Sequence, residues 1–85
     1  MRYVLKVSEW NPDKRSVGDD DFDIIRDVVS EMALSRDMVR DELDIGFDED
    51  DGSVVIDTDR RSSKGAWSDL FVTVISDLFD DGGAP

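Results

Sequence analysis

The chain has 85 residues and a mass of 9.6 kDa, the size of one small domain, and its 22 Asp and Glu against 10 Lys and Arg give a formal net charge of -12. It contains no Cys and no His, which excludes disulfides, thiol or imidazole chemistry, and zinc sites built on those ligands. Its 39% hydrophobic residues suffice for one small core. We therefore expect a single acidic domain over residues 1–85 that is not an enzyme and needs no cofactor or metal.

Charge and hydropathy also bear on location and partners. The first nine residues are too short and too charged for a signal peptide, and no apolar run approaches the roughly 18 residues of a membrane span. We therefore expect a cytoplasmic protein. Because phosphate groups repel a negative surface, direct binding to nucleic acid or to anionic lipid is disfavoured. The expected partner is a protein with a basic surface.

The acidic residues are grouped in blocks along the chain. Residues 19–31 carry six acids and one base, residues 41–59 carry nine acids and no base, and residues 69–85 carry four acids and no base. Bases are concentrated in residues 1–18 and 60–68. A surface that serves only solubility would mix the two signs, so these blocks indicate charged patches.

The acids are also unusual in kind, because 18 of the 22 are Asp. Glu is the better helix former, and ordinary helix surfaces favour it. Asp loses less side-chain entropy when it is fixed, which suits a charge held in a defined position. The alternative explanation is compositional, since salt-adapted and high-GC proteomes enrich Asp, and Arg over Lys.

The first element along the chain is predicted to be a strand over residues 2–10, where apolar and polar side chains alternate. Its inward-facing residues would be Tyr3, Leu5 and Val7. Asn11, Pro12 and Asp13 end the strand, and a polar loop follows. Asp19 or Asp20 is then expected to cap a helix.

Apolar residues at helical spacing between residues 20 and 33 predict a helix that packs one face on a sheet. On the opposite side, four carboxylates follow one another at spacings of three, four and four residues, over roughly 16 Å. They are Asp20, Asp23, Asp27 and Glu31, and we call them the acidic stripe. Like charges at these spacings repel one another, so the stripe costs stability and indicates a role in binding.

A hairpin is predicted after this helix. Ser35 is first expected to cap a short helical turn over Met38, Val39 and Leu43. Ile45 and Phe47 then alternate with acids, residues 53–58 are mostly apolar and β-branched, and Asp51-Gly52 is typical of a two-residue turn. The acids of the outward face and turn would be Asp48, Glu49, Asp50 and Asp51, with Asp57 and Asp59 at the far end. Charge on a hairpin also prevents association of sheet edges, which is the alternative role for some of these residues.

The last element is predicted to be a buried C-terminal helix, because the apolar residues from Trp67 to Phe79 cover about 200° of a helical wheel. Gly82 and Gly83 are the expected stop. Asp77, Asp80 and Asp81 lie at its C-terminal end, where the helix dipole disfavours an acid by roughly 0.3 to 1 kcal/mol. The fold class is therefore α+β, in the order β-α-β-β-α, with a three-stranded antiparallel sheet packed by helices on one face.

Two segments carry incomplete metal motifs. Residues 54–59 form an apolar strand followed by Asp-x-Asp, as in magnesium-dependent phosphotransfer folds, but those folds need far more chain for their other ligands. Residues 48–52 resemble a calcium loop, yet alignment on Gly52 puts Phe47 and Thr58 where acids are required. These segments predict at most loose binding of a divalent cation, and no catalysis.

The remaining chemistry is that of a charged surface. Duplex DNA presents about one charge per 1.7 Å of its axis, and the Arg and Lys arrays that grip phosphates also accept carboxylates at similar spacing. In size, charge and lack of catalytic groups the chain is similar to the small acidic inhibitors that phages encode against restriction enzymes, CRISPR effectors and uracil-DNA glycosylase. This resemblance of class implies a nucleic-acid mimic that binds the basic groove of a DNA- or RNA-handling protein.

We expect the acids of residues 19–31 and 41–59 to form the contact surface, extended by the C-terminal acids if the last helix ends beside the hairpin. The candidate partner-binding residues are Asp20, Asp23, Asp27, Glu31, Asp48, Glu49, Asp50, Asp51, Asp57, Asp59, Asp77, Asp80 and Asp81. Two alternatives stay open. One is a small domain of a salt-adapted organism, whose acids keep it hydrated. The other is an immunity- or antitoxin-like protein that neutralises a basic nuclease.

Overall fold

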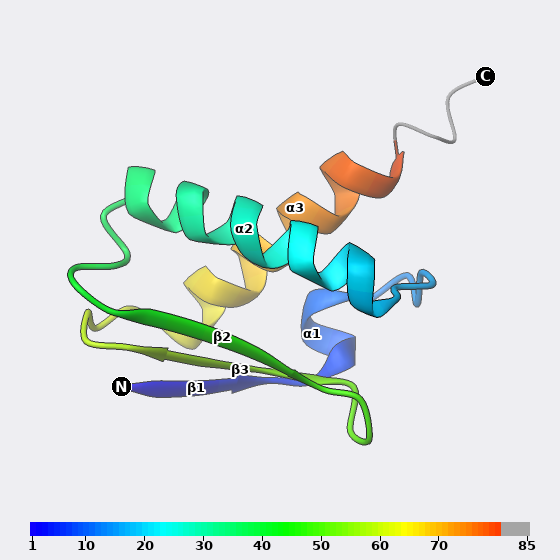
Figure 1. Cartoon of the computed structure of the whole chain (residues 1–85), viewed down its shortest axis with the longest axis horizontal. Coiled ribbons are helices and arrows are strands. Elements are labelled where there is room, and N and C mark those ends of the chain that lie inside the picture. The colour runs from blue at the N-terminus through cyan, green and yellow to red at the C-terminus, as the bar shows by residue number, and fades with distance from the viewer. Residues whose placement is uncertain (81–85) are drawn as a thin grey trace.

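The structure, a computed structural model, describes residues 1–80 and confirms the predicted α+β class. Three antiparallel strands form one sheet in the order β1-β3-β2, and the helices cover one of its faces while the other face is open (Figure 1). The elements in chain order are β1 (Arg2–Leu5), α1 (Val7–Trp10), α2 (Asp19–Ser35), β2 (Leu43–Asp48), β3 (Ser53–Thr58) and α3 (Lys64–Asp80). None of the helices in this part of the chain is long and apolar enough to cross a bilayer.

The predicted strand over residues 2–10 is too long, because the chain turns into the short helix α1 after β1. Strand β3 begins at Ser53 and pairs Val54 with Leu5, so it offers little to pair with beyond Leu5. The turn is closed by Glu9, whose side chain accepts a hydrogen bond from the Lys6 backbone N–H at 2.7 Å. As a result Val7 is exposed, and Trp10 takes the buried position.

The core lies between the sheet and the helices. Its largest fully buried side chains are Trp10, Trp67, Phe71, Leu5, Ile25, Ile56, Leu70, Val29, Val54 and Val74. Trp10 joins α1 to the hairpin, because its ring meets Phe47 edge to face at 5.7 Å between centroids and its Nε1 donates to the Gly52 carbonyl at 3.2 Å. The apolar spacing of α2 and α3 therefore buries the faces that the sequence predicts, and α1 adds an aromatic anchor.

Helix α2 begins without either of the predicted caps. Asp21 accepts a hydrogen bond from the Gly18 backbone N–H at 3.2 Å, whereas Asp19 and Asp20 lie inside the first turn. Three acids in that turn are favoured by the positive end of the helix dipole. Part of the negative charge at this position therefore stabilises the helix itself.

The helical turn predicted after Ser35 is absent, because Ser35 belongs to α2 and donates to the Met32 carbonyl at 2.8 Å. The helix ends at Ser35 with Arg36 as its C-cap, and Asp37, which follows the cap, adopts a left-handed φ of 57°. The next residue, Met38, donates its backbone N–H to the Ala33 carbonyl at 2.8 Å and buries its side chain. Such a bond satisfies one of the last carbonyls of a helix.

The hairpin forms as predicted, but its loop has four residues and not two. Asp48 pairs with Ser53, so Glu49 to Gly52 make the connection. Gly52 takes a φ of 64°, and its N–H donates to the Asp48 carbonyl at 2.8 Å. Asp51-Gly52 marks the left-handed residue correctly, because glycine adopts this conformation without strain. It does not by itself determine the length of the loop.

Candidate acidic interface

The two acidic segments meet at one end of the molecule, where the start of α2 lies near the hairpin loop (Figure 1). Asp19 and Glu49 line the same shallow groove between α2 and β2. Hydrogen bonding to Asp19 and repulsion by its carboxylate raise the pKa of Glu49 above its usual value, and Asp50 adds to the repulsion. Carboxylates that are 30 residues apart in the sequence are thus brought together at this end of the molecule.

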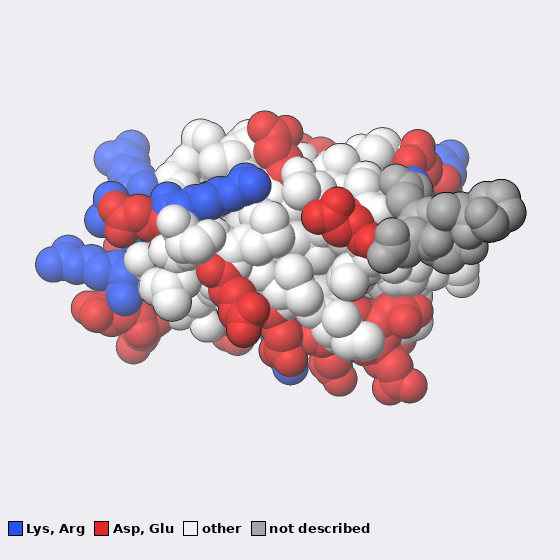
Figure 2. All heavy atoms as spheres, turned by 90° about the horizontal axis from the view of Figure 1, so that it is seen from above, with Lys and Arg blue, Asp and Glu red and all other residues white. Residues whose placement is uncertain are grey.

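The acidic stripe runs along the outside of α2, and all four of its side chains are exposed. Seen over the helices, acidic side chains follow the lower margin of the molecule (Figure 2). The stripe is less strained than its spacing predicts, because Arg26 lies 3.6 Å from Asp23 and 3.8 Å from Asp27. Four carboxylates and one guanidinium leave three net negative charges, and exposed pairs of this kind contribute little to stability.

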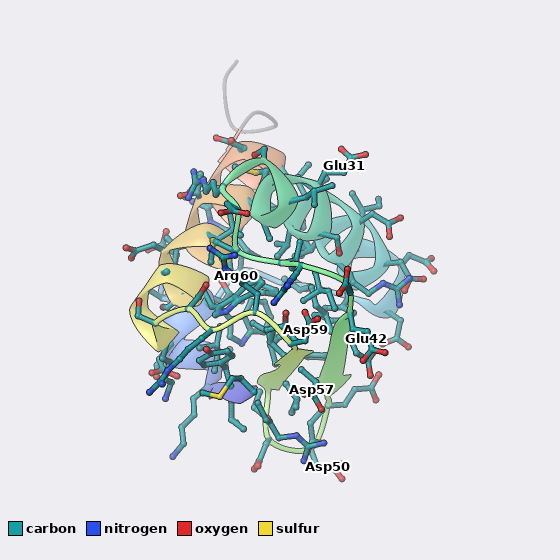
Figure 3. All side chains as sticks on the ribbon, turned by 90° about the vertical axis from the view of Figure 1, so that its left-hand side faces the viewer. Glu31, Glu42, Asp50, Asp57, Asp59 and Arg60 are labelled. Atoms are coloured by element: carbon teal, nitrogen blue, oxygen red, sulfur yellow. The ribbon has the colours of Figure 1, made fainter. Side chains whose placement is uncertain are left out.

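Asp57 lies on the open face of the sheet, away from the stripe. It pairs with Arg2 on one side, with 3.8 Å between their charged groups, and stands opposite Asp44 on the other. In Figure 3, Asp57 and Asp50 lie in the lower part of the view with the strands, whereas Glu31 lies at the top, on α2. The predicted contact residues therefore wrap around the α2 and β2 side and do not form one flat surface.

Asp59 has a structural role in the loop between α2 and β2. Its Oδ1 accepts hydrogen bonds from the backbone N–H groups of Asp41 and Glu42, at 3.2 and 3.4 Å. These bonds lower the pKa of Asp59, the bond from Asp41 having the larger effect. Within residues 1–80 no three carboxylates are arranged as a metal site, at the Asp-x-Asp segment or elsewhere.

Of the predicted C-terminal acids, the structure describes the side chain of Asp77 alone. Helix α3 packs on α2, α1 and β1, and its last turns bring Leu78 and Phe79 beside Asp21 and Ile24 of α2. The condition for extending the surface, a last helix that ends beside the hairpin, is therefore not met by the described turns of α3. Asp77 is exposed on α3, whereas the side chain of Asp80, and all of Asp81 and the predicted Gly82-Gly83 stop, lie outside the described residues.

Bases gather at the opposite end, which Figure 2 shows in blue on the left. The loops between α2 and β2 and between β3 and α3 meet there and carry Arg36, Arg40, Arg60 and Arg61. Arg60 pairs with Asp37 at 3.0 Å. The molecule is therefore most acidic where α2 begins and the hairpin turns, and more balanced where α2 ends.

Sequence reasoning missed four exposed acids as individual contact candidates, namely Asp19, Asp41, Glu42 and Asp44. Asp44 alternates with Ile45 along β2, so the strand pattern already places it on the outward face. Asp19 gives no comparable signal, because its nearness to Glu49 depends on how the hairpin lies against α2. It is nevertheless the residue that joins the two segments.

No family model, no curated protein and no solved structure matches the chain.

The excess of acids predicts that salt stabilises the fold. Screening weakens repulsion between exposed charges, since the Debye length falls from about 30 Å at 0.01 M salt to 3 Å at 1 M. The melting midpoint should rise by roughly 4 °C or more over this range, which corresponds to about 1 kcal/mol for a domain of this size. Circular dichroism melts over a sodium chloride series measure the effect. A flat midpoint would show that repulsion is negligible, and a chain folded only near molar salt would favour salt adaptation.

The raised pKa of Glu49 predicts how the stability of the fold changes with pH. Because its pKa is higher in the folded state than in the unfolded chain, its ionisation destabilises the fold, and this cost disappears as the pH falls through the folded pKa toward 4.5. Glu9 and Asp59, whose pKa values are lowered, lose their stabilising effect only at lower pH. Glu49→Gln should therefore stabilise the protein at pH 7 and reduce its gain in stability between pH 7 and 4.5. Urea unfolding at several pH values tests this, with Glu31→Gln as the control. An equal gain on acidification in both variants would contradict it.

Proposed function

We propose that this protein is an acidic inhibitor that imitates nucleic acid and occupies the basic groove of a DNA- or RNA-handling protein. The observation that carries the proposal is the meeting of Asp19 with Glu49, which joins the α2 stripe to the hairpin loop. A groove that binds a phosphate backbone favours such a continuous array of negative charge. The protein would act by binding alone, in the cytoplasm, without catalysis.

The way the charges are held supports the same proposal. The stripe lies on a helix of 17 residues, and the hairpin loop is tied to the core through Trp10 and Gly52. Charges fixed on helices and strands lose little entropy on binding, and preorganisation of this kind improves affinity. The stripe covers roughly 16 Å, a length over which duplex DNA presents on the order of ten phosphates.

The test is competition with nucleic acid. Proteins captured by the immobilised chain from a nuclease-treated lysate are identified by mass spectrometry, purified, and bound again to the chain at 0.15 M salt. Duplex DNA or structured RNA should displace the purified partner, whereas an equal mass of uncharged dextran should not. A captured partner that resists displacement by both nucleic acids would overturn the proposal.

The same measurement separates the two alternatives. A partner with nuclease activity that the chain abolishes, through a site that nucleic acid does not compete for, would favour the immunity-like function. A chain that captures no basic protein at any salt concentration would favour the domain of a salt-adapted organism.

A further inference from the structure

The groove between α2 and β2 has an apolar floor that the acidic stripe lacks. Phe22, Ile45 and Phe47 form this floor, and the rings of Phe22 and Phe47 stack with their centroids 5.1 Å apart. Phe47 is only partly buried, whereas Phe22 and Ile45 are buried. The groove encloses about 320 Å³, which is enough for one long side chain of a partner.

Carboxylates stand on the rim of this groove, and they are not equally paired. Asp23 is 3.6 Å from Arg26, which also lines the groove. Within residues 1–80, neither Asp19 nor Glu49 forms an ion pair, because Arg26, which lines the same groove, pairs with Asp23 and Asp27. The repulsion between Asp19 and Glu49 shows in the raised pKa of Glu49. A cation placed between Asp19 and Glu49 would remove that repulsion and gain two ionic contacts.

We infer that this groove is a receptor for one arginine side chain of the basic partner, held by Asp19 and Glu49 and lying against Phe47. A partly buried aromatic ring beside unpaired carboxylates suits a guanidinium in particular. The guanidinium is planar, stacks on aromatic rings, and presents a fork of N–H donors to carboxylates. A lysine ammonium offers a compact, strongly hydrated charge that gains less from the ring. The inference rests on the proposed function, because it names the partner group that this part of the surface would recognise.

The core holds the floor of the groove in place before any ligand arrives. Phe47 is held by two rings, since it meets the Trp10 ring edge to face and stacks on Phe22. Trp10 is 1% exposed and donates to the Gly52 carbonyl in the hairpin loop. Interfaces gain most of their affinity from such central, preformed pockets for Arg or aromatic side chains.

The experiment uses the peptide acetyl-Gly-Arg-Gly-amide and the full ¹⁵N-labelled chain at low salt. Saturable shifts are expected at the amides of Gly46, Phe47 and Glu49, and the citrulline peptide, which has the same shape without the charge, should produce none. Glu49→Gln should weaken arginine binding about three- to tenfold, as expected for the loss of one ionic contact to a guanidinium. Asp20→Asn also removes one negative charge, but from a part of the stripe that does not line the groove. It should change the affinity for the arginine peptide less than twofold. Phe47→Leu keeps an apolar side chain and should weaken binding about two- to fivefold.

Three outcomes would overturn the inference. The first is amide shifts spread over the whole acidic surface, and the second is an effect of Asp20→Asn on affinity equal to that of Glu49→Gln. The third is equal affinity for the same peptide with lysine in place of arginine. Each would show that the surface attracts positive charge without recognising arginine in this groove. If a variant has altered amide spectra before titration, its circular dichroism melt shows whether it is still folded. Glu49→Gln changes an exposed residue, so its effect on the affinity for the arginine peptide is the deciding result. The result is independent of the competition experiment: a partner displaced by duplex from a chain that does not bind the arginine peptide would leave the proposed function standing without this groove.

Discussion

Trp10→Ala should destabilise the protein by about 3–5 kcal/mol, the range found when a large buried aromatic side chain is removed. The ring is 1% exposed, meets Phe47 and Phe71 edge to face, and donates to the Gly52 carbonyl. A small domain has a total stability of roughly 5–15 kcal/mol, so a large part of it would be lost. Urea unfolding followed by far-ultraviolet circular dichroism measures the change without relying on tryptophan fluorescence.

Two further variants separate the contributions of Trp10. Trp10→Phe keeps an aromatic ring but removes the donor to Gly52, so it should cost less than the alanine variant. Ser8→Ala changes an exposed residue of the same short helix and should stay within about 0.5 kcal/mol of the original chain. If Trp10→Ala also stays within 1 kcal/mol, the side chain does not anchor the hairpin loop as the structure indicates.

Trp10 also shows where sequence reasoning reaches its limit. The alternation of Tyr3 and Leu5 correctly predicts a strand, and both side chains are buried. Extending the same pattern to Val7 fails, because the pairing partner ends near Val54 and the chain turns. The length of a partner strand is a property of the tertiary structure, so it leaves no mark in the local pattern.

The long helices were predictable because their signals are local. In α2 and α3 the apolar residues recur at helical spacing, and the sequence alone indicates which face each helix buries. The length of the loop from Glu49 to Gly52 is harder to predict from the sequence. The reason is that Asp-Gly marks a left-handed residue in two-residue and four-residue loops alike. The direction in which α3 ends, beside Asp21 and not beside the hairpin, depends on packing that no local pattern encodes.

The candidate interface was predictable in composition and not in shape. Charge blocks identify the acids of α2 and of the hairpin, and all of these acids except the half-buried Asp21 are exposed. The nearness of Asp19 to Glu49 depends on how the hairpin lies against the start of α2, and the pairs of Arg26 with Asp23 and Asp27 depend on the rotamer of that side chain. The structure thus places the most acidic part of the surface where α2 begins and the hairpin turns.

Neutralising the stripe should slow association with the basic partner about tenfold at low salt, because electrostatic steering raises association rates by roughly 10 to 10³. The variant combines Asp20→Asn, Asp23→Asn, Asp27→Asn and Glu31→Gln, and takes the formal net charge from -12 to -8. Its rate should also depend less steeply on salt. The free energy of unfolding should change little, because the lost repulsion is offset by the lost contacts of Arg26 with Asp23 and Asp27.

The matched control removes four exposed acids that belong neither to the stripe nor to the hairpin, by Asp13→Asn, Asp37→Asn, Asp69→Asn and Asp77→Asn. It has the same net charge, so a difference between the two variants reports where the charge lies and not how much there is. Stopped-flow association over a salt series should show the control within about threefold of the original chain. Equal slowing in both variants would mean that only the total charge attracts the partner. An unchanged rate, affinity and salt slope in the stripe variant would show that the stripe is a solvated helix face, and imitation of nucleic acid would then lose its main support.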